Sequence, residues 1–375
     1  MNEPTVLSNQ DVARLLQDPS ADTRASLAPK LAGQLDSEAL SRSEFAIAHD
    51  ILNLMARDTA VVVRRALADN LKTTRNLPRD VALTMARDID DVAVPLLETS
   101  EVFTDEDLVE LVREVPEAKQ MAIARRGTVS APVADALIET DNQHVVETVV
   151  RNDGAELTEQ TLNRVLDRFG DVEDIQQPMT YRQELPMTVA ERLVSRVSDH
   201  LKNYLMTHHE LSADTASELV LKARERATMN LMGPNADDLD VERLVAQLHA
   251  NRRLTPSIVF RALCVGDLSF FEHAMAQLGD VPVMNARALI HDRGTLGLKS
   301  LYDRTGLPDR LFPAMRVAVG ILEQTDPRAK DFDRASFGEL MLERILTNAD
   351  DLHPDDADYL LRKLDDLAAQ PSTAA

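Results

Sequence analysis

Apolar residues recur at helical spacing along most of the chain, and their clearest repetition lies between residues 255 and 320. Pro256, Pro282 and Pro308 stand 26 residues apart, and each is followed by an apolar segment that ends in Ala-Leu or Ala-Met. Proline has no N–H and a fixed φ, so it suits the first turn of a helix. Self-similarity at a period of ~20–50 residues is typical of repeat proteins. We therefore predict units of two antiparallel helices with a period of about 26 residues.

A second set of related segments fills the first half of the chain. Each begins with acidic or polar residues and continues as a short helix, and the starts are Asp58, Asp88, Val115 and Thr140. The partner helices are predicted to begin near Pro78, Thr104, Ser130 and Thr158. One helix pair cannot bury its apolar face alone, so the pairs must stack on their neighbours. The predicted fold is all-α, a right-handed-type solenoid of HEAT-like helix pairs.

Two segments interrupt this pattern. Residues 170–187 lack helical periodicity and are predicted to form a longer loop, and residues 231–240 are rich in turn-forming and acidic residues. Between them, residues 188–208 carry an apolar stripe at helical spacing and are predicted to form one long helix. Helices of such unequal length indicate a kink or a boundary. We favour one continuous superhelix, with two packed lobes as the alternative.

These features divide the chain into successive regions. They are N-terminal helices and a cap (1–40), N-terminal helical repeats (41–170), an irregular loop, long helix and boundary region (171–250), C-terminal 26-residue helical repeats (251–325), an acidic C-terminal helical cap (326–369) and a disordered tail (370–375). The cap is predicted to hold helices at residues 333–347 and 354–368. A polar terminal unit is what a repeat array needs to shield its exposed core.

The composition supports a helical core and argues against nucleic-acid binding. Hydrophobic residues make up 44% of the 375 residues and aromatic residues only 3%, which suits the packing of helix on helix. The formal net charge is −22. Because such a chain repels phosphate backbones, nucleic acid is not an expected partner.

The cysteine content and the N-terminus bear on the compartment. Cys264 is the single cysteine, which excludes an intramolecular disulfide and fits a reducing compartment. The N-terminus lacks a basic stretch followed by an apolar run. No apolar run approaches the ~18 residues of a membrane span. We therefore expect a cytoplasmic protein without a signal peptide or a membrane span.

The repeats resemble known helical families. The Arg-x-x-Leu-Ala pattern at Arg64–Ala68 resembles HEAT-like and leucine-rich-variant repeats. The order of segments is similar to that of the DUF2336 family of alphaproteobacterial proteins over roughly residues 45–325, and the segments are 61–70, 88–100, 124–152, 293–299 and 311–316. The resemblance implies an all-helical fold. It brings no established activity and no catalytic residues to carry over.

Arginines recur at related positions of the repeats and form the first candidate site. They are Arg64, Arg65, Arg125, Arg126, Arg151, Arg261 and Arg287. One interpretation is structural, because repeated arginines pair with carboxylates of the next unit or bind helix-end carbonyl groups. The other is functional: a line of donors along a concave surface grips a carboxylate or phosphate of a partner.

The second candidate site lies in the irregular region. His200, Tyr204 and His208 share one face of the predicted long helix, and Tyr181 and Arg182 precede it. His200 and His208 are ~12 Å apart on a helix, so they cannot bind one metal ion by themselves. No glycine-rich phosphate loop, Gly-x-Ser-x-Gly, His-Glu-x-x-His or Cys-x-x-Cys motif occurs. We expect no metal and no cofactor.

Two functional hypotheses follow. The favoured one is a non-catalytic scaffold or adaptor that binds a protein partner along a concave helical surface, through apolar anchors and the recurrent arginines. It rests on analogy between repeat folds. The alternative is a ligand-responsive regulator or enzyme with a small-molecule pocket near residues 170–250. The sequence leaves the identity of the partner and the oligomeric state open.

Overall fold

A computed structural model describes residues 13, 17–36, 40–182, 185–208, 212–232, 236–292, 295–324 and 334–348. These ranges contain helices and one isolated parallel bridge between Val129 and Ala155, but no β-strand. The predicted all-helical fold is confirmed. The chain splits into two compact units, Met1–Leu185 and Pro186–Ala375, called here the N-terminal and the C-terminal unit. The predicted helix at 354–368 and the predicted tail lie outside the described residues.

The N-terminal unit consists of helix pairs that follow one another along the chain. Its helices are α2 (Ala21–Ala25), α3 (Ala28–Leu35), α4 (Arg42–Ala56), α5 (Val61–Leu71), α6 (Arg79–Ala86), α7 (Asp90–Thr99), α8 (Asp105–Glu114), α9 (Glu117–Ala124), α10 (Ala131–Glu139), α11 (Gln143–Arg151), α12 (Glu159–Phe169) and α13 (Glu173–Thr180). The predicted partner helices begin where expected, since their N-caps are Pro78, Thr104, Ser130 and Thr158.

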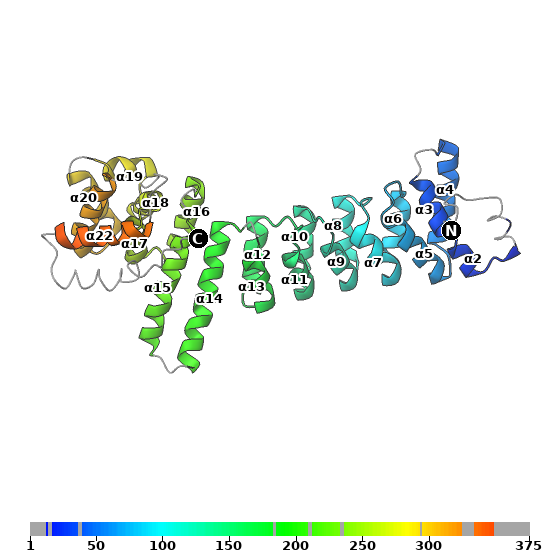
Figure 1. Cartoon of the computed structure of the whole chain (residues 1–375), viewed down its shortest axis with the longest axis horizontal. Helices are drawn as coiled ribbons and strands as arrows, with labels where there is room; N and C mark the ends of the chain where they lie inside the picture. The colour runs from blue at the N-terminus through cyan, green and yellow to red at the C-terminus, as the bar shows by residue number, and fades with distance from the viewer. Residues whose placement is uncertain are drawn as a thin grey trace. The chain divides into compact units, whose positions relative to one another are not determined.

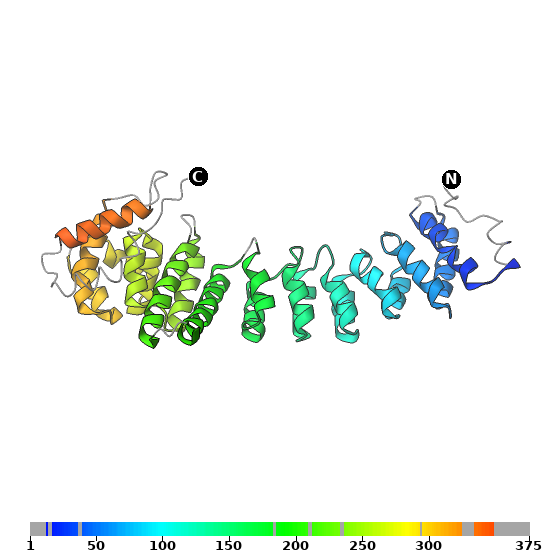
Figure 2. The ribbon, with the colours of Figure 1, turned by 60° about the horizontal axis from the view of Figure 1, so that its bottom comes forward.

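Odd-numbered and even-numbered helices of this unit form two layers (Figure 1). In one layer, each helix from α3 to α11 packs against the next odd-numbered helix. In the other, α4 packs against α6, and α10 packs against both α8 and α12. Each even-numbered helix from α4 to α12 also contacts the odd-numbered helix that follows it, and Figure 2 shows the same pairs from a second side. Each pair thus buries its apolar face against its neighbours.

Hydrogen bonds at the N-caps define where several of these helices begin. The Thr104 hydroxyl accepts a bond from the Asp107 N–H, and the Asp107 carboxylate accepts one from the Thr104 N–H. Ser41 and Glu44 form the same reciprocal capping box at the start of α4. Such caps bind N–H groups that have no partner inside the helix. The helix starts are therefore encoded locally.

The loop predicted for residues 170–187 is wrong in part, because α13 lies inside it. Pro178 stands in the last turn of α13 and removes one helical hydrogen bond, which disguises the helical pattern. Ile175 and Met179 are buried one turn apart, where α13 packs against α11 and α12. Each fully buried side chain of this size stabilises the fold by about 1.5–3 kcal/mol, so packing outweighs the lost bond.

The C-terminal unit begins with the long helix predicted for residues 188–208. Its helices are α14 (Met187–His208), α15 (Ala213–Leu231), α16 (Asp238–Ala250), α17 (Pro256–Cys264), α18 (Leu268–Gly279), α19 (Val283–Ile290), α20 (Thr295–Thr305), the 3-10 helix η1 (Asp309–Leu311), α21 (Phe312–Leu322) and α22 (Arg334–Asn348). The helix α18 lies at the centre of this unit, since it packs against α16, α17, α19 and α20. Its side chains Phe270, Phe271 and Met275 are fully buried.

The repeats of 26 residues correspond to the pairs α17–α18 and α19–α20. Gly279 ends α18 and Gly306 follows α20, and Gly306 has a left-handed φ of 70° that suits glycine. The two pairs differ in burial, because Leu296 on α20 is exposed whereas Phe270, 26 residues earlier on α18, is buried. The helix α18 packs against α16, α17, α19 and α20, whereas α20 packs against α18, α19 and α21.

Candidate functional site

Arginines of one repeat pair with aspartates of the next in the N-terminal unit. Arg24 on α2 contacts Asp58 ahead of α5, with Nε 2.7 Å from Oδ2, and Arg64 on α5 contacts Asp88 ahead of α7, with Nε 2.5 Å from Oδ2. The hydrogen bond from Arg24 holds the pKa of Asp58 below its usual value. A second donor of Arg64 reaches the carbonyl oxygen of Asp58 at 2.6 Å. Arg64 therefore joins two repeats.

The C-terminal ends of the odd-numbered helices are capped by side chains from the next repeat. Arg126 donates to the carbonyl oxygens of Leu97 and Ser100, each at 2.7 Å, at the end of α7. The amide of Asn152 donates to the carbonyl oxygens of Ala124 and Arg126, each at 2.8 Å, at the end of α9. The last carbonyl groups of a helix lack partners within it. These caps satisfy them across the repeat boundary.

The same arrangement recurs at the end of α11 and uses Arg182. Its guanidinium donates to the carbonyl oxygens of Val150, Asn152 and Ala155 at 3.1, 3.1 and 2.6 Å. Burial lowers the pKa of both Arg126 and Arg182. Arg64 and Arg126 thus follow the structural interpretation of the recurrent arginines: Arg64 pairs with a carboxylate of the next repeat, and Arg126 binds helix-end carbonyl groups.

We expect Arg126→Met to destabilise the N-terminal unit by about 2 kcal/mol, because two bonds from a charged donor are lost and two carbonyl groups stay unbonded. Urea unfolding measures the loss, and hydrogen exchange should localise it to the end of α7. Arg125→Met is the matched control, since the neighbouring Arg125 is exposed. Equal losses in the two variants would contradict the capping role.

The other early arginines lie nearer the solvent. Arg65 lies 3.5 Å from Asp91 in an exposed pair, and Arg151 contacts Glu147 at 3.0 Å one turn earlier on α11. Exposed pairs of this kind contribute ~0–1 kcal/mol and exchange readily with water. Together with Arg125, these side chains remain accessible to a partner.

In the C-terminal unit, Arg261 and Arg287 lie in different surroundings. Arg261 is buried on α17. Arg287 on α19 bridges two acids, with Nη2 3.0 Å from Asp238 and Nε 2.6 Å from Glu272. His291 adds a contact of 2.7 Å to Glu272. The network therefore ties α16, α18 and α19 together.

Asp238 is the most strongly perturbed acid of this network. Hydrogen bonds from Ser269 and Arg287 lower its pKa to about 2, and His273 lies 3.2 Å away. The carboxylate is the first residue of α16, where a negative charge also favours the helix dipole. The arrangement stabilises the helix contacts by keeping this carboxylate ionised.

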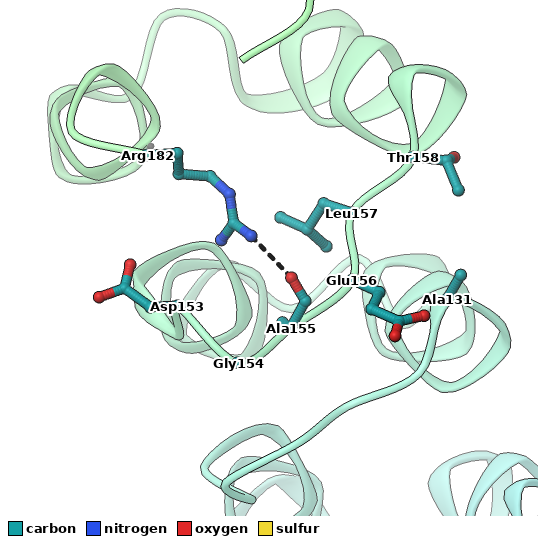
Figure 3. Close-up of a pocket in the computed structure, with 8 residues that line it drawn as sticks. All are labelled: Ala131, Asp153, Gly154, Ala155, Glu156, Leu157, Thr158 and Arg182. Atoms are coloured by element: carbon teal, nitrogen blue, oxygen red, sulfur yellow. Dashed lines mark hydrogen bonds between the residues drawn. The ribbon is translucent and has the colours of Figure 1, made fainter. Parts of the chain in front are cut away.

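A hollow of about 520 Å³ in the N-terminal unit contains one residue of the predicted pocket, Arg182. It is lined by Ala131, Asp153, Gly154, Ala155, Glu156, Leu157, Thr158 and Arg182. Figure 3 shows the Arg182 guanidinium turned toward the Ala155 carbonyl oxygen at the wall. Its donors are thus engaged in capping α11. Tyr181 next to it is 76% exposed and does not line the hollow.

The remaining residues of the predicted pocket belong to the C-terminal unit. His200 and Tyr204 lie on α14 and are exposed. His208 ends α14, and its side chain lies outside the described residues. The described parts of each unit thus place Arg182 at a hollow and leave His200 and Tyr204 on a solvent-facing helix.

A comparison with protein families identifies the chain. The model of a family described as "Uncharacterised protein conserved in bacteria (DUF2336)" matches residues 92–353, more than half of the chain. The chain belongs to the DUF2336 family. The match starts within α7 and extends beyond α22, so it includes parts of both units. No curated protein and no solved structure matches this chain.

The other candidate groups in the described part of this DUF2336 protein are metal ligands and the single thiol. Among those residues, no group of three or more His, Cys, Asp or Glu side chains is placed to hold a metal ion. Cys264 is buried on α17, and burial raises the pKa of its thiol to about 12. A thiol that stays protonated is a poor nucleophile.

A search of the described helices finds none with the length and apolarity needed to cross a membrane.

Exposed apolar side chains occur on two sets of neighbouring helices, and of these residues only Tyr204 belongs to a site predicted from the sequence. In the N-terminal unit, those of α4, α5 and the start of α7 are exposed, namely Phe45, Ile47, Leu54, Val61, Val62 and Ile89. In the C-terminal unit, the second half of α14 and the facing part of α15 carry Val197, Leu201, Tyr204, Met206 and Leu219. The sequence contains these residues within apolar stripes, but only packing tells which part of a stripe stays uncovered.

Proposed function

We propose that this DUF2336 protein is a non-catalytic scaffold that binds another protein through the apolar side chains of its first repeats. The observation that carries the proposal is the exposure of Ile47, Leu54, Val61, Val62 and Ile89, called here the N-terminal apolar surface. These residues lie on three helices that pack in sequence, α4 against α5 and α5 against α7. Their exposure on neighbouring helices supports an interaction site here, because large exposed apolar patches typically mark such sites.

The distribution of exposed residues within the N-terminal unit supports this location. Leu54 is 75% exposed although α4 also has a buried apolar face of Ala48, Leu52 and Met55. Ile47 lies seven residues before Leu54, on the same side of α4. A helix that serves only the core needs one apolar face. The second face of α4 therefore has no role inside the described part of the unit.

The later repeats of the unit offer a different surface. Their exposed side chains form ion pairs between repeats, such as Arg168 with Asp141 at 2.7 Å. Tyr181 is the only large apolar side chain that the described part of α8 to α13 and its ends leaves exposed. Apolar anchors supply most of the affinity of a protein interface. The exposed apolar side chains therefore favour the first repeats as the binding surface, and the exposed Arg65 adds a positive charge there.

A partner-capture experiment tests the proposal. The tagged protein is purified from its native cells after cross-linking, beside the double variant Leu54→Glu with Val62→Glu and the control Tyr181→Glu. The control places one such glutamate on an even more exposed residue of the same unit. Matching circular dichroism spectra would show that all three proteins are folded.

We expect one strongly enriched protein with wild type and control, and at least a tenfold lower yield with the double variant, since a buried charge removes several kcal/mol of binding. Cross-links should fall on α4, α5 or α7. Enrichment that survives in the double variant, or that is lost equally in the control, would rule out this surface. A small molecule that co-purifies without any protein would favour the alternative of a ligand-responsive regulator.

A further inference from the structure

The helices α14 and α15 form a long hairpin whose outer half is left largely exposed by the described residues of the C-terminal unit. They pack along each other and reverse direction between His208 and Ala213. Figure 1 shows both helices extending well past α16 on the side of this reversal. Near the other end, Val189 and Leu193 of α14 are buried where α16 packs against them. In the part of the chain that the structure describes, the outer half of the hairpin therefore consists of two helices with no third helix packed along them.

One side of this outer half is apolar. Val197, Leu201 and Tyr204 stand at i, i+4 and i+7 on α14, which places them on one side of the helix. Leu219 on α15 lies at about the level of Leu201, because the two helices run antiparallel. The side chains of these four residues are between 44% and 53% exposed. We call them the hairpin apolar side.

We propose that the hairpin apolar side binds the same side of a second copy of this chain, so that two hairpins form a four-helix bundle. A pair of antiparallel helices with one apolar side is half of such a bundle. A two-fold axis brings identical surfaces together, so each residue of the hairpin apolar side packs against its symmetry-related set. The inference concerns a surface in the other unit from the one proposed to bind a partner protein, and it is independent of that proposal.

The charge balance favours a second copy at this position. With a formal charge of −22, two chains repel each other over most of their surfaces. The hairpin is an exception, because α14 and α15 together carry six basic and five acidic residues. The basic residues are Arg192, Arg196, Lys202, Lys222, Arg224 and Arg226, and the acidic ones are Glu191, Asp199, Asp214, Glu218 and Glu225. Two copies can therefore meet here without net repulsion.

The placement of these charges selects one arrangement of the two hairpins. From residue 196 onward, α14 carries Arg196, Asp199 and Lys202 and has a net positive charge, whereas α15 up to residue 222 carries Asp214, Glu218 and Lys222 and has a net negative charge. A two-fold axis along the hairpin places α14 of one copy over α15 of the other. The net positive part of each copy then faces the net negative part of the other on both flanks of the apolar contact. The reverse arrangement, α14 over α14, would bring like charges together, which opposes association.

The oligomeric state of the full chain tests the proposal. Sedimentation velocity and light scattering are recorded from about 1 to 100 µM for wild type, Leu201→Glu and the control Leu296→Glu. Leu296 on α20 is 79% exposed and lies in the same unit, away from the hairpin. We expect a dimer for wild type and control, and a dimer dissociation constant at least tenfold higher for Leu201→Glu. A monomeric wild type at the highest concentration overturns the proposal, as does a dimer that Leu201→Glu leaves intact.

A charge exchange tests the arrangement separately. Lys202→Glu and Glu218→Lys should each raise the dissociation constant about tenfold, and the double variant should return to within about threefold of wild type. Additive losses in the double variant would exclude the placement of α14 over α15. Binding of a different protein to a wild-type monomer through Leu201 would also overturn the proposal, because the hairpin would then serve another partner.

Discussion

Replacing Gly154 with alanine should destabilise the N-terminal unit by about 3 kcal/mol or more, the upper range for forcing an extra carbon into a packed site. A β-carbon at this position would lie 2.0 Å from the carbonyl oxygen of Gly127, which is backbone and cannot turn aside. Two backbone hydrogen bonds hold the segment around Gly154 against the segment around Val129. The Val129 N–H donates to the Gly154 carbonyl oxygen at 3.0 Å, and the Glu156 N–H donates to the Val129 carbonyl oxygen at 2.8 Å. The alanine must break this bridge.

Gly127→Ala is the matched control for this substitution. Its added carbon meets no atom within 4 Å, and neither glycine has a positive φ, so backbone freedom affects both variants alike. Urea unfolding compares the free energies, and hydrogen exchange reports whether the amides of Val129 and Glu156 lose protection. Similar stability of the two variants would show that the connecting segments shift apart without cost, contrary to the close approach seen here.

Replacing Arg253 with methionine should destabilise the C-terminal unit by about 3–5 kcal/mol, the usual cost of removing one partner of a buried ion pair. The side chain of Glu191 on α14 is only 1% exposed, and Arg253 is its charged partner, with Nη1 3.1 Å from Oε1. The Gln247 amide also donates to Glu191, at 2.9 Å, but it carries no charge. Without Arg253, the buried carboxylate lacks a compensating cation.

The double variant Glu191→Gln with Arg253→Met separates the charge from the packing. A neutral amide keeps its bond with Gln247 and needs no cation, so most of the lost stability should return. Hydrogen exchange read separately on peptides of the two units is the appropriate measurement, because a chain of two units does not have to unfold in one step. A double variant as unstable as Arg253→Met would locate the effect in packing around the guanidinium.

The recurrent arginines illustrate how one residue type divides into different roles. Arg64 and Arg126 bind aspartates or helix-end carbonyl groups of an adjacent repeat, and Arg287 joins two acids of neighbouring helices. Arg65 and Arg125 remain exposed. The partner binding that we propose is therefore assigned to the exposed apolar side chains of α4 and α5 and not to the buried arginines.

The sequence by itself determined the helical character of the described part of this protein, because helix formation depends on neighbours within about one turn. The apolar periodicity located α14, and the caps at Thr104 and Thr158 located α8 and α12. The exception was α13, where Pro178 masked a helix that packing stabilises. Local signals were sufficient wherever the stabilising contacts were local.

The tertiary structure decided what the side chains do. Arg126 reaches carbonyl groups 26 and 29 residues earlier, and Gly154 meets a carbonyl 27 residues earlier, so neither role has a local signature. The stripe on α14 continues unchanged from Leu193 to Leu201, yet only its first part is buried. Burial depends on which helices arrive from elsewhere in the chain, and for this reason the candidate interaction surfaces became visible only in the folded protein.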